Sequence, residues 1–279
     1  MTAAASTARA GRGGAGAAWT KPLDKILNNR CWLLRERPFP HFVAQDVFVP
    51  AVYDQLAGAF QELIDAGTSE TPGRRLAKGM RGYDAYGVNF APAARGPFRL
   101  FASRRWHDLI ANVTGVEGTG HMMCGVHHHA VGSSSGKVHN DLNPGWFVDS
   151  VGPDGVTLAR HGVIDYGTGA LRKPGFVPRP LVRAVAMLFY LNNRPWHPGD
   201  GGETGLYQSS RTPVDQPVAR VPPINNSLLI FECTPTSFHT FISNTRHPRN
   251  TVILWLHRPR AEAVSRFGRE AIVEWPRRR

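Results

Sequence analysis

Two kinds of hydrophobic spacing divide the chain. Between Pro50 and Gly67, apolar residues recur every three or four positions, which predicts an amphipathic helix with proline in its first turn and glycine at its end. A second helical pattern runs over about 97–113 and stops before Gly115. Beyond about residue 119 the apolar runs become short and are broken by Gly, Pro, Asn and Ser, which predicts strands joined by turns.

The strand-rich part of the chain indicates the fold class. About eight short strands with hydrophobic residues on both faces predict a jelly roll, the double-stranded β-helix of cupin-like proteins. With the helices upstream, the chain is expected to be mainly β with flanking helices, an α+β fold. The strands are predicted at 122–131, 137–141, 184–192, 205–208, 227–232, 239–242 and 251–258.

The chain is expected to form one domain behind a tail. The first eighteen residues are almost all small residues and arginine, too poor in apolar surface to offset the entropy of ordering, so a flexible tail is predicted over 1–20. The single domain would span 21–279, with N-terminal helices over about 36–118 and a jelly-roll core over about 119–262. The interval of about 147–181 is polar and rich in Gly and Pro, which predicts an insertion or lid near the mouth of the barrel.

Charge and hydrophobicity limit the classes of partner that the chain is expected to bind. The 279 residues carry a net charge of +12, which suits a small-molecule or peptide substrate that is acidic or carrier-bound. Nucleic acid is disfavoured, because part of this charge sits in the terminal segments, at Arg9, Arg12 and residues 277–279. No apolar run approaches the roughly 20 residues of a membrane-spanning helix, so no membrane partner is expected. The sequence does not indicate an oligomeric state.

The cysteines indicate a reducing compartment. Cys31, Cys124 and Cys233 lack the paired spacing of a zinc site or a disulfide framework, so reduced and mostly buried thiols are expected. The Ala- and Gly-rich start lacks the continuous apolar core of a secretory signal. We therefore expect a cytoplasmic protein.

The strongest candidate for chemistry is a histidine and a carboxylate two positions apart. His139 and Asp141 would face the same side of a strand, and His239, about a hundred residues later, would complete a three-point site from another strand. Two histidines and one carboxylate form the facial triad that holds Fe(II) and leaves positions open for a co-substrate and oxygen. Taken alone, a His-x-Asp pair is more typical of a hydrogen-bonded pair at the surface.

A series of motifs in order resembles the 2-oxoglutarate and Fe(II)-dependent dioxygenase superfamily, in particular its prolyl-hydroxylase-like branch. The likeness covers most of the chain outside residues 1–30 and about 147–181. Its strength comes from the order of the motifs, because each alone is a weak signal. The matching segments are His139-Asn140-Asp141, Phe189-Tyr190-Leu191-Asn192 with Trp196 and Gly201-Gly202, Leu228-Leu229-Ile230-Phe231 with Pro235, Phe238 and His239, and Arg249 with Trp255.

The resemblance implies a cofactor set and an iron site. It implies that His139, Asp141 and His239 bind Fe(II), and that 2-oxoglutarate and O2 are the co-substrates. The intact Asp141 favours hydroxylation, desaturation or cyclisation, because halogenating relatives replace this carboxylate to make room for chloride.

The resemblance also implies a set of co-substrate residues. Arg249 would bind the distal carboxylate of 2-oxoglutarate through its rigid fork of donors, and Tyr190 would reach the same carboxylate. Trp255 would supply an aromatic wall, because it shares one face of a strand with Arg249. Thr204 falls near a wall position of this pocket that is usually apolar in the prolyl-hydroxylase branch.

Other residues compete for some of these roles. Arg246 and His247 are alternatives to Arg249, but Pro248 places them in a turn before the strand.

Two further groups of residues each allow a structural or a functional interpretation. In the run at 127–129, only the first and third histidines could converge, and we expect a structural or substrate-facing role for one of them in preference to a second metal site. Arg81, Tyr83 and Tyr86 would form either part of a substrate rim or an ordinary exposed loop.

The function implied by the resemblance is hydroxylation of an unactivated carbon, with release of succinate and CO2. The basic charge and the long insertion favour an amino acid, a peptide or another natural-product scaffold as substrate. One alternative is a hydroxylase of prolyl or other residues in a protein, and another is nucleobase demethylation, for which the spacing of Arg258 fits poorly. A further alternative is a non-catalytic, cupin-like metal- or ligand-binding protein. The regiochemistry and stereochemistry stay open.

Overall fold

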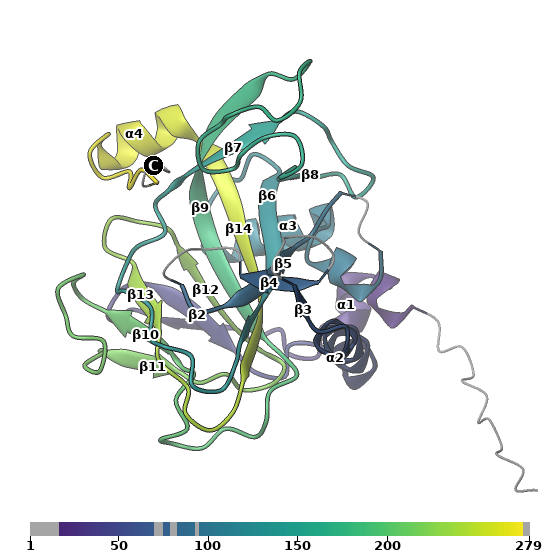
Figure 1. Ribbon diagram of the computed structural model, residues 1–279, viewed down its shortest axis with the longest axis vertical. Helices are drawn as coiled ribbons and strands as arrows, with labels where there is room; N and C mark the ends of the chain where they lie inside the picture. Colours follow the sequence, from purple (N-terminus) through teal and green to yellow (C-terminus); the bar gives the residue numbers. More distant parts are fainter. Residues whose placement is uncertain (1–16, 70–74, 79–82, 93–94, 276–279) are drawn as a thin grey trace, which may run out of the picture.

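Two β-sheets of unequal size enclose the interior of the protein (Figure 1). The computed structural model describes residues 17–69, 75–78, 83–92 and 95–275. The strands are β1 (Leu33–Arg35), β2 (His41–Ala44), β3 (Thr68–Ser69), β4 (Leu76–Lys78), β5 (Tyr86–Asn89), β6 (His121–His129), β7 (Pro144–Val148), β8 (Thr157–Leu158), β9 (Pro178–Tyr190), β10 (Thr204–Tyr207), β11 (Ala219–Val221), β12 (Ser227–Glu232), β13 (Phe238–Phe241) and β14 (Arg249–Pro259).

The larger sheet has 11 strands and the smaller has three. The path through the larger sheet is β1-β2-β12-β9-β14-β6-β5-β4-β3, with β7 also paired to β9 and β8 to β6. The smaller sheet has the order β11-β10-β13. This arrangement confirms the predicted jelly-roll core.

The helices that precede β6 cover the outer face of the larger sheet, the smaller sheet lies over its inner face, and α4 packs separately, against the cluster between the sheets (Figure 1). The helices are η1 (Ala18–Thr20), α1 (Leu23–Ile26), α2 (Pro50–Asp65), η2 (Pro97–Leu100), α3 (Arg104–Thr114) and α4 (Arg260–Phe267). The helix predicted after Pro50 is confirmed. The pattern over 97–113 is split in two, because Ser103 caps α3 by accepting a hydrogen bond from the backbone N–H of Trp106.

The alternation of residues along β14 separates two cores. Val252, Leu254 and Leu256 pack into the large cluster beneath the helices, whereas Ile253 and Trp255 belong to the cluster between the two sheets. The face of β14 that is directed toward the smaller sheet therefore also carries the polar residues at the start of this strand.

Two strand predictions differ from the structure. Residues 137–141 form no continuous strand and join the smaller sheet only through a bridge between His139 and His239. β9 begins at Pro178, well before residue 184, because its first residues pair with β7, with Gly145 opposite Leu181. The predicted insertion thus begins and ends as paired strands, and its role as a lid stays a prediction.

No helix in the described part of the chain is long and apolar enough to cross a membrane.

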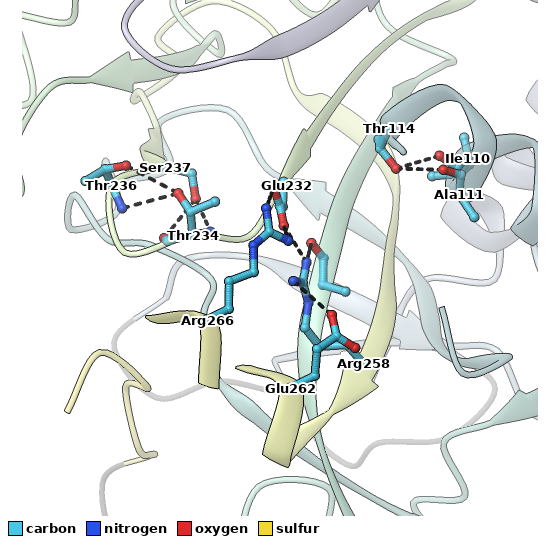
Figure 2. Close-up of polar contacts among 11 residues, drawn as sticks. Ile110, Ala111, Thr114, Glu232, Thr234, Thr236, Ser237, Arg258, Glu262 and Arg266 are labelled. Carbon is cyan, nitrogen blue, oxygen red and sulfur yellow. Dashed lines mark hydrogen bonds and ion pairs between the residues drawn. The ribbon is translucent and has the colours of Figure 1, made fainter. Parts of the chain in front are cut away.

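A buried arginine ties the C-terminal helix α4 to the larger sheet (Figure 2). Arg258 is fully buried, and its Nη2 donates to Glu232 Oε1 at 2.6 Å while its Nη1 lies 3.4 Å from Glu262 Oε1 in α4. Arg266, from the last turn of α4, donates to both oxygens of Glu232 at 2.5 and 3.1 Å. One carboxylate therefore joins β12, β14 and α4.

We predict that Arg258→Ala lowers the free energy of unfolding by about 3 kcal/mol, because it removes a buried cation and its packed stem from between two carboxylates. Arg266→Ala is the control. Its side chain is 49% exposed, so its loss should cost less than about 1 kcal/mol. Denaturant unfolding measures both changes, and equal effects of the two variants would contradict this account.

Candidate metal centre and co-substrate pocket

Two histidines and one aspartate converge between the sheets. The ligand atoms of His139, Asp141 and His239 lie within 4.8 Å of one another, and no other such group of three occurs among the described residues. Nε2 of His139 is 3.8 Å from Asp141 Oδ1, and Nε2 of His239 is 3.6 Å from Asp141 Oδ2. The bridge between residues 139 and 239 sets the two imidazoles side by side, with ring centroids 4.6 Å apart.

Backbone carbonyls fix the tautomers of both histidines. Nδ1 of His139 lies 2.7 Å from the carbonyl oxygen of Lys137, and Nδ1 of His239 lies 3.1 Å from that of Ser237. A carbonyl oxygen can only accept, so each neutral ring carries its proton on Nδ1 and keeps a lone pair on Nε2. Both free lone pairs belong to the atoms that face Asp141.

The carboxylate of Asp141 is held from two sides. Arg183 Nη1 donates to Oδ1 and Trp255 Nε1 donates to Oδ2, each at 2.7 Å. Burial raises the pKa of Asp141, but its electrostatic surroundings, the Arg183 guanidinium first among them, hold the pKa well below the usual range. Asp141 is therefore an oriented anion, which is the form that binds a metal.

Arg183 is positioned by aromatic residues from distant parts of the chain. Its guanidinium carbon lies 3.7 Å from the centroid of the Trp255 ring, and its Nε donates to Tyr166 Oη at 3.3 Å. The Tyr166 hydroxyl also lies 2.7 Å from Nε2 of His257. Tyr166 comes from the segment between β7 and β9, so the insertion predicted from sequence reaches the residue that holds Asp141.

A second buried arginine lies at the start of β14. Arg249 is 2% exposed, and its Nη2 donates to Thr204 Oγ1 at 2.9 Å. The same oxygen is 2.7 Å from Tyr190 Oη, so the threonine joins the other two side chains. The structure thus brings together three of the four residues expected around 2-oxoglutarate.

The fourth residue, Trp255, has a different hydrogen-bond partner. Its indole nitrogen donates to Asp141 and not to the group formed by Arg249, Thr204 and Tyr190. Six residues of strand span about 20 Å, so two side chains on one face of β14 need not share a pocket. This contact gives Trp255 a second role beside Asp141, and the expectation that it walls the co-substrate pocket stays a prediction.

The Gly-Gly segment brings Thr204 next to Arg249. Gly201 and Gly202 have φ of 76° and 83°, and a Cβ on Gly201 would lie 2.1 Å from the carbonyl oxygen of Ser243. Only glycine accommodates both the left-handed conformation and this approach. Trp196 Nε1 donates to the Gly201 carbonyl oxygen at 3.0 Å, which explains the tryptophan of the same motif.

Arg249 differs from Arg183 in having no acidic partner among the described residues. Its Nε is buried and has no hydrogen-bond partner among these residues, and the same holds for His127 Nδ1 and Thr251 Oγ1. Thr251 lies opposite His127 in the β14–β6 pair, so these three atoms belong to one face of two neighbouring strands. An unpaired buried cation is costly, so this arrangement fits the binding of an anionic group.

The histidine run and the aromatic loop residue complete the surroundings. Burial and the cations Arg249 and Arg183 lower the pKa of His127 to about 4, so the ring is neutral at pH 7. His129 stacks on Phe241 at 3.7 Å, and its Nε2 is 3.3 Å from Tyr83 Oη. His129 is thus packed within the interior.

The two competitors of Arg249 proposed from sequence are exposed, and His247 lies next to Arg249 in the lining of a small cavity. Arg246 is 69% exposed and lies 3.5 Å from Asp200, and His247 is exposed, in the turn before β14. Tyr86 packs against His128 on the other face of β6, with ring centroids 6.3 Å apart. Arg81 lies outside the described residues.

Comparisons with known proteins agree with this geometry. Residues 178–257 match the family model of the 2OG-Fe(II) oxygenase superfamily, a stretch that contains β9 to β13 and most of β14. No curated protein matches the sequence.

Solved structures resemble the chain at low identity. A prolyl hydroxylase from Trichoplax adhaerens, in complex with a hypoxia inducible factor peptide fragment, is 16% identical with a TM-score of 0.52, covering 81% of this chain and 86% of its own. A Pseudomonas putida prolyl-4-hydroxylase is 17% identical with a TM-score of 0.49, covering 78% and 92%. HygX from Streptomyces hygroscopicus, with nickel, 2-oxoglutarate and hygromycin B bound, is 15% identical with a TM-score of 0.43, covering 79% and 83%.

The donors present fit the cofactors of this family. Two imidazole Nε2 atoms and a carboxylate are ligands that Fe(II) takes, and an unpaired buried guanidinium suits a dicarboxylate co-substrate. Over residues 178–257 the chain matches the 2OG-Fe(II) oxygenase superfamily, and its fold and donor set fit an oxygenase that uses Fe(II), 2-oxoglutarate and O2.

Proposed function

We propose that His139, Asp141 and His239 bind the iron, and that Arg249, Thr204 and Tyr190 bind 2-oxoglutarate. The observation that carries this proposal is the contrast between two buried arginines. Arg183 forms an ion pair with Asp141. Among the described residues, by contrast, Arg249 has no carboxylate within 4 Å, and its Nε has no hydrogen-bond partner. A dicarboxylate co-substrate would supply the missing anion.

Each side chain then has a definite task. The iron, 2-oxoglutarate and oxygen together supply the oxidation of an unactivated C–H bond. Asp141 binds as an anion in an orientation set by Arg183 and Trp255. Arg249 orients the far carboxylate, and Thr204 holds the guanidinium in place. The hydrophobic residues between the sheets limit water around the reacting groups.

The substrate approaches from the side of His139. This side chain is 45% exposed, whereas those of Asp141 and His239 are 7% and 9% exposed. We propose that the substrate is an amino acid, a peptide or another natural-product scaffold, and the net charge of +12 favours one that is acidic or carrier-bound. Succinate release measured across free amino acids, short peptides and carrier-bound compounds tests this class.

A second candidate is hydroxylation of a residue within a protein. The Trichoplax enzyme, whose fold this chain shares, is in complex with a peptide fragment of a protein. Succinate release with intact proteins but not with free amino acids would favour this candidate. We further propose that the enzyme acts in the cytoplasm, where its three free cysteines would stay reduced.

Anaerobic addition of Fe(II) and 2-oxoglutarate should produce the weak visible charge-transfer absorption of the chelate. Asp141→Ala should abolish this absorption and succinate release, because it removes the only anionic ligand of the group. His128→Gln is the matched control, since that ring faces the other side of β6 and contacts Asn250. Normal turnover by Asp141→Ala would refute the proposed iron site.

Arg249→Lys should raise the KM for 2-oxoglutarate by roughly 10–100-fold, the equivalent of one charge-assisted hydrogen bond of about 1.5–3 kcal/mol. Lysine keeps the charge but loses the planar fork. Fe(II) affinity, measured by anaerobic titration, should not change. Arg246→Lys, at the exposed neighbour, should leave both quantities unaltered. If the two variants had the same KM, Arg249 would not be the carboxylate ligand.

Trp255→Phe should lower Fe(II) affinity about 10–100-fold, because it deletes the indole N–H that orients Asp141. Trp275→Phe makes the same chemical change at an indole that donates to the Pro144 carbonyl oxygen. That control should bind Fe(II) as the parent protein does. An unchanged Fe(II) affinity in Trp255→Phe would show that the indole hydrogen bond does not support the site.

A further inference from the structure

A groove of about 740 Å³ opens at one edge of the jelly roll, between the two sheets. β1 and β2 of the larger sheet form one wall, and β11 of the smaller sheet forms the other. The residues that define this edge groove are Asn29, Cys31, Leu33, Arg35, Arg37, His41, Val43, Ala44, Gln45, Asp46, Ala219, Arg220, Val221, Pro222, Ile224, Ser227 and Leu228.

The edge groove is separate from the metal centre. β11 and β13 are the two outer strands of the smaller sheet, and the groove lies at β11 whereas His239 lies on β13. Aromatic rings fill the space between them. Phe39 packs on Phe231 at 5.6 Å, and Phe231 packs on His239 at 4.7 Å. A ligand in the groove would therefore not contact the iron ligands directly.

The charges that line the edge groove are mainly positive. Arg35, Arg37 and Arg220 face one acidic residue of the lining, Asp46. Arg220 lies 3.6 Å from Glu203 and is therefore already paired. Arg35 and Arg37 are exposed and have no acidic partner within 4 Å in the described part of the chain. The groove thus presents two arginines that are free to bind an anionic partner.

The wall of the edge groove that is formed by β1 and β2 ends in an unpaired strand edge. β1 is the first strand of the larger sheet and pairs only with β2, so half of its backbone groups have no strand partner among the described residues. Leu33 and Leu34 on β1 are 56% and 50% exposed. Exposed apolar side chains on a free edge are the features to which an added strand binds.

We propose that the edge groove binds an acidic segment of a partner protein, which adds in extended conformation to β1. Carboxylates of the segment would pair with Arg35 and Arg37, and its backbone would continue the sheet. A second copy of this chain is a poor occupant, because pairing β1 with β1 would bring the like charges of two such grooves together.

Cys31 provides a reporter for this binding. It lines the groove and is exposed, whereas Cys124 and Cys233 are buried. A fluorescein-labelled peptide of about ten residues with alternating Glu and Val, long enough to extend along β1, is the probe. It should bind in fluorescence anisotropy and slow the alkylation of Cys31 by iodoacetamide at least about tenfold.

Matched variants separate the contributions of charge and backbone. Arg35→Glu with Arg37→Glu should weaken peptide binding at least about tenfold, and the Gln pair should do so to a smaller extent. Arg75→Glu with Arg269→Glu makes the same charge change away from the groove and should have little effect. A peptide with alternating Glu and Pro has the same charge but lacks alternate N–H donors, so it should bind at least about tenfold more weakly.

Three results would overturn the proposal. The first is equal binding by the Arg35 and Arg37 variants and the parent protein, with normal thermal unfolding of both. The second is equal binding of the Glu-Val and Glu-Pro peptides, which would exclude strand addition. The third is concentration-dependent dimerisation that itself protects Cys31, which would assign the groove to a second copy. None of these results depends on iron or on turnover.

Discussion

The ion pair between Asp141 and Arg183 is the contact on which the site depends. It keeps a carboxylate ionised in the interior, at 2.7 Å from a guanidinium that is itself buried. Without this cation, burial would favour the neutral acid, which donates a proton where a metal ligand must offer a lone pair. Trp255 completes the arrangement by fixing the second oxygen. The proposed metal-binding anion is therefore held in place by Arg183 and Trp255, which are not among its proposed ligands.

The fold separates two uses of a buried arginine. Both side chains lie on the inner face of the larger sheet, Arg183 on β9 and Arg249 on β14. Arg183 has its anion built into the protein, so it stabilises a fixed structure. Within the described part of the chain, the Arg249 guanidinium donates only to a threonine hydroxyl, so its charge favours an incoming carboxylate. The proposed sites for the iron and the co-substrate thus lie in one interior, and they differ in charge because only one of the two arginines has a built-in acidic partner among the described residues.

Local sequence patterns predicted part of the fold and of the candidate site. Period-two alternation after Pro248 predicted that Arg249 and Trp255 share one face of a strand, and both lie on the inner face of β14, because side-chain direction along a strand is a local property. Helix α2 followed from its proline start and its apolar spacing.

The features that could not be predicted from the sequence depend on long-range packing. Arg183 lay just outside the predicted strand, and its partner Tyr166 lay in the polar insertion, so nothing in either local sequence indicated their contact. The edge groove was also missed, since it is formed by strands distant in sequence.

An anaerobic crystal structure with Mn(II) in place of Fe(II) and with 2-oxoglutarate would test the central claim most directly. The account predicts that the metal is bound by Nε2 of His139, Nε2 of His239 and a carboxylate oxygen of Asp141. It also predicts that the far carboxylate of 2-oxoglutarate contacts Arg249. A metal bound by other residues, or a co-substrate carboxylate away from Arg249, would contradict it.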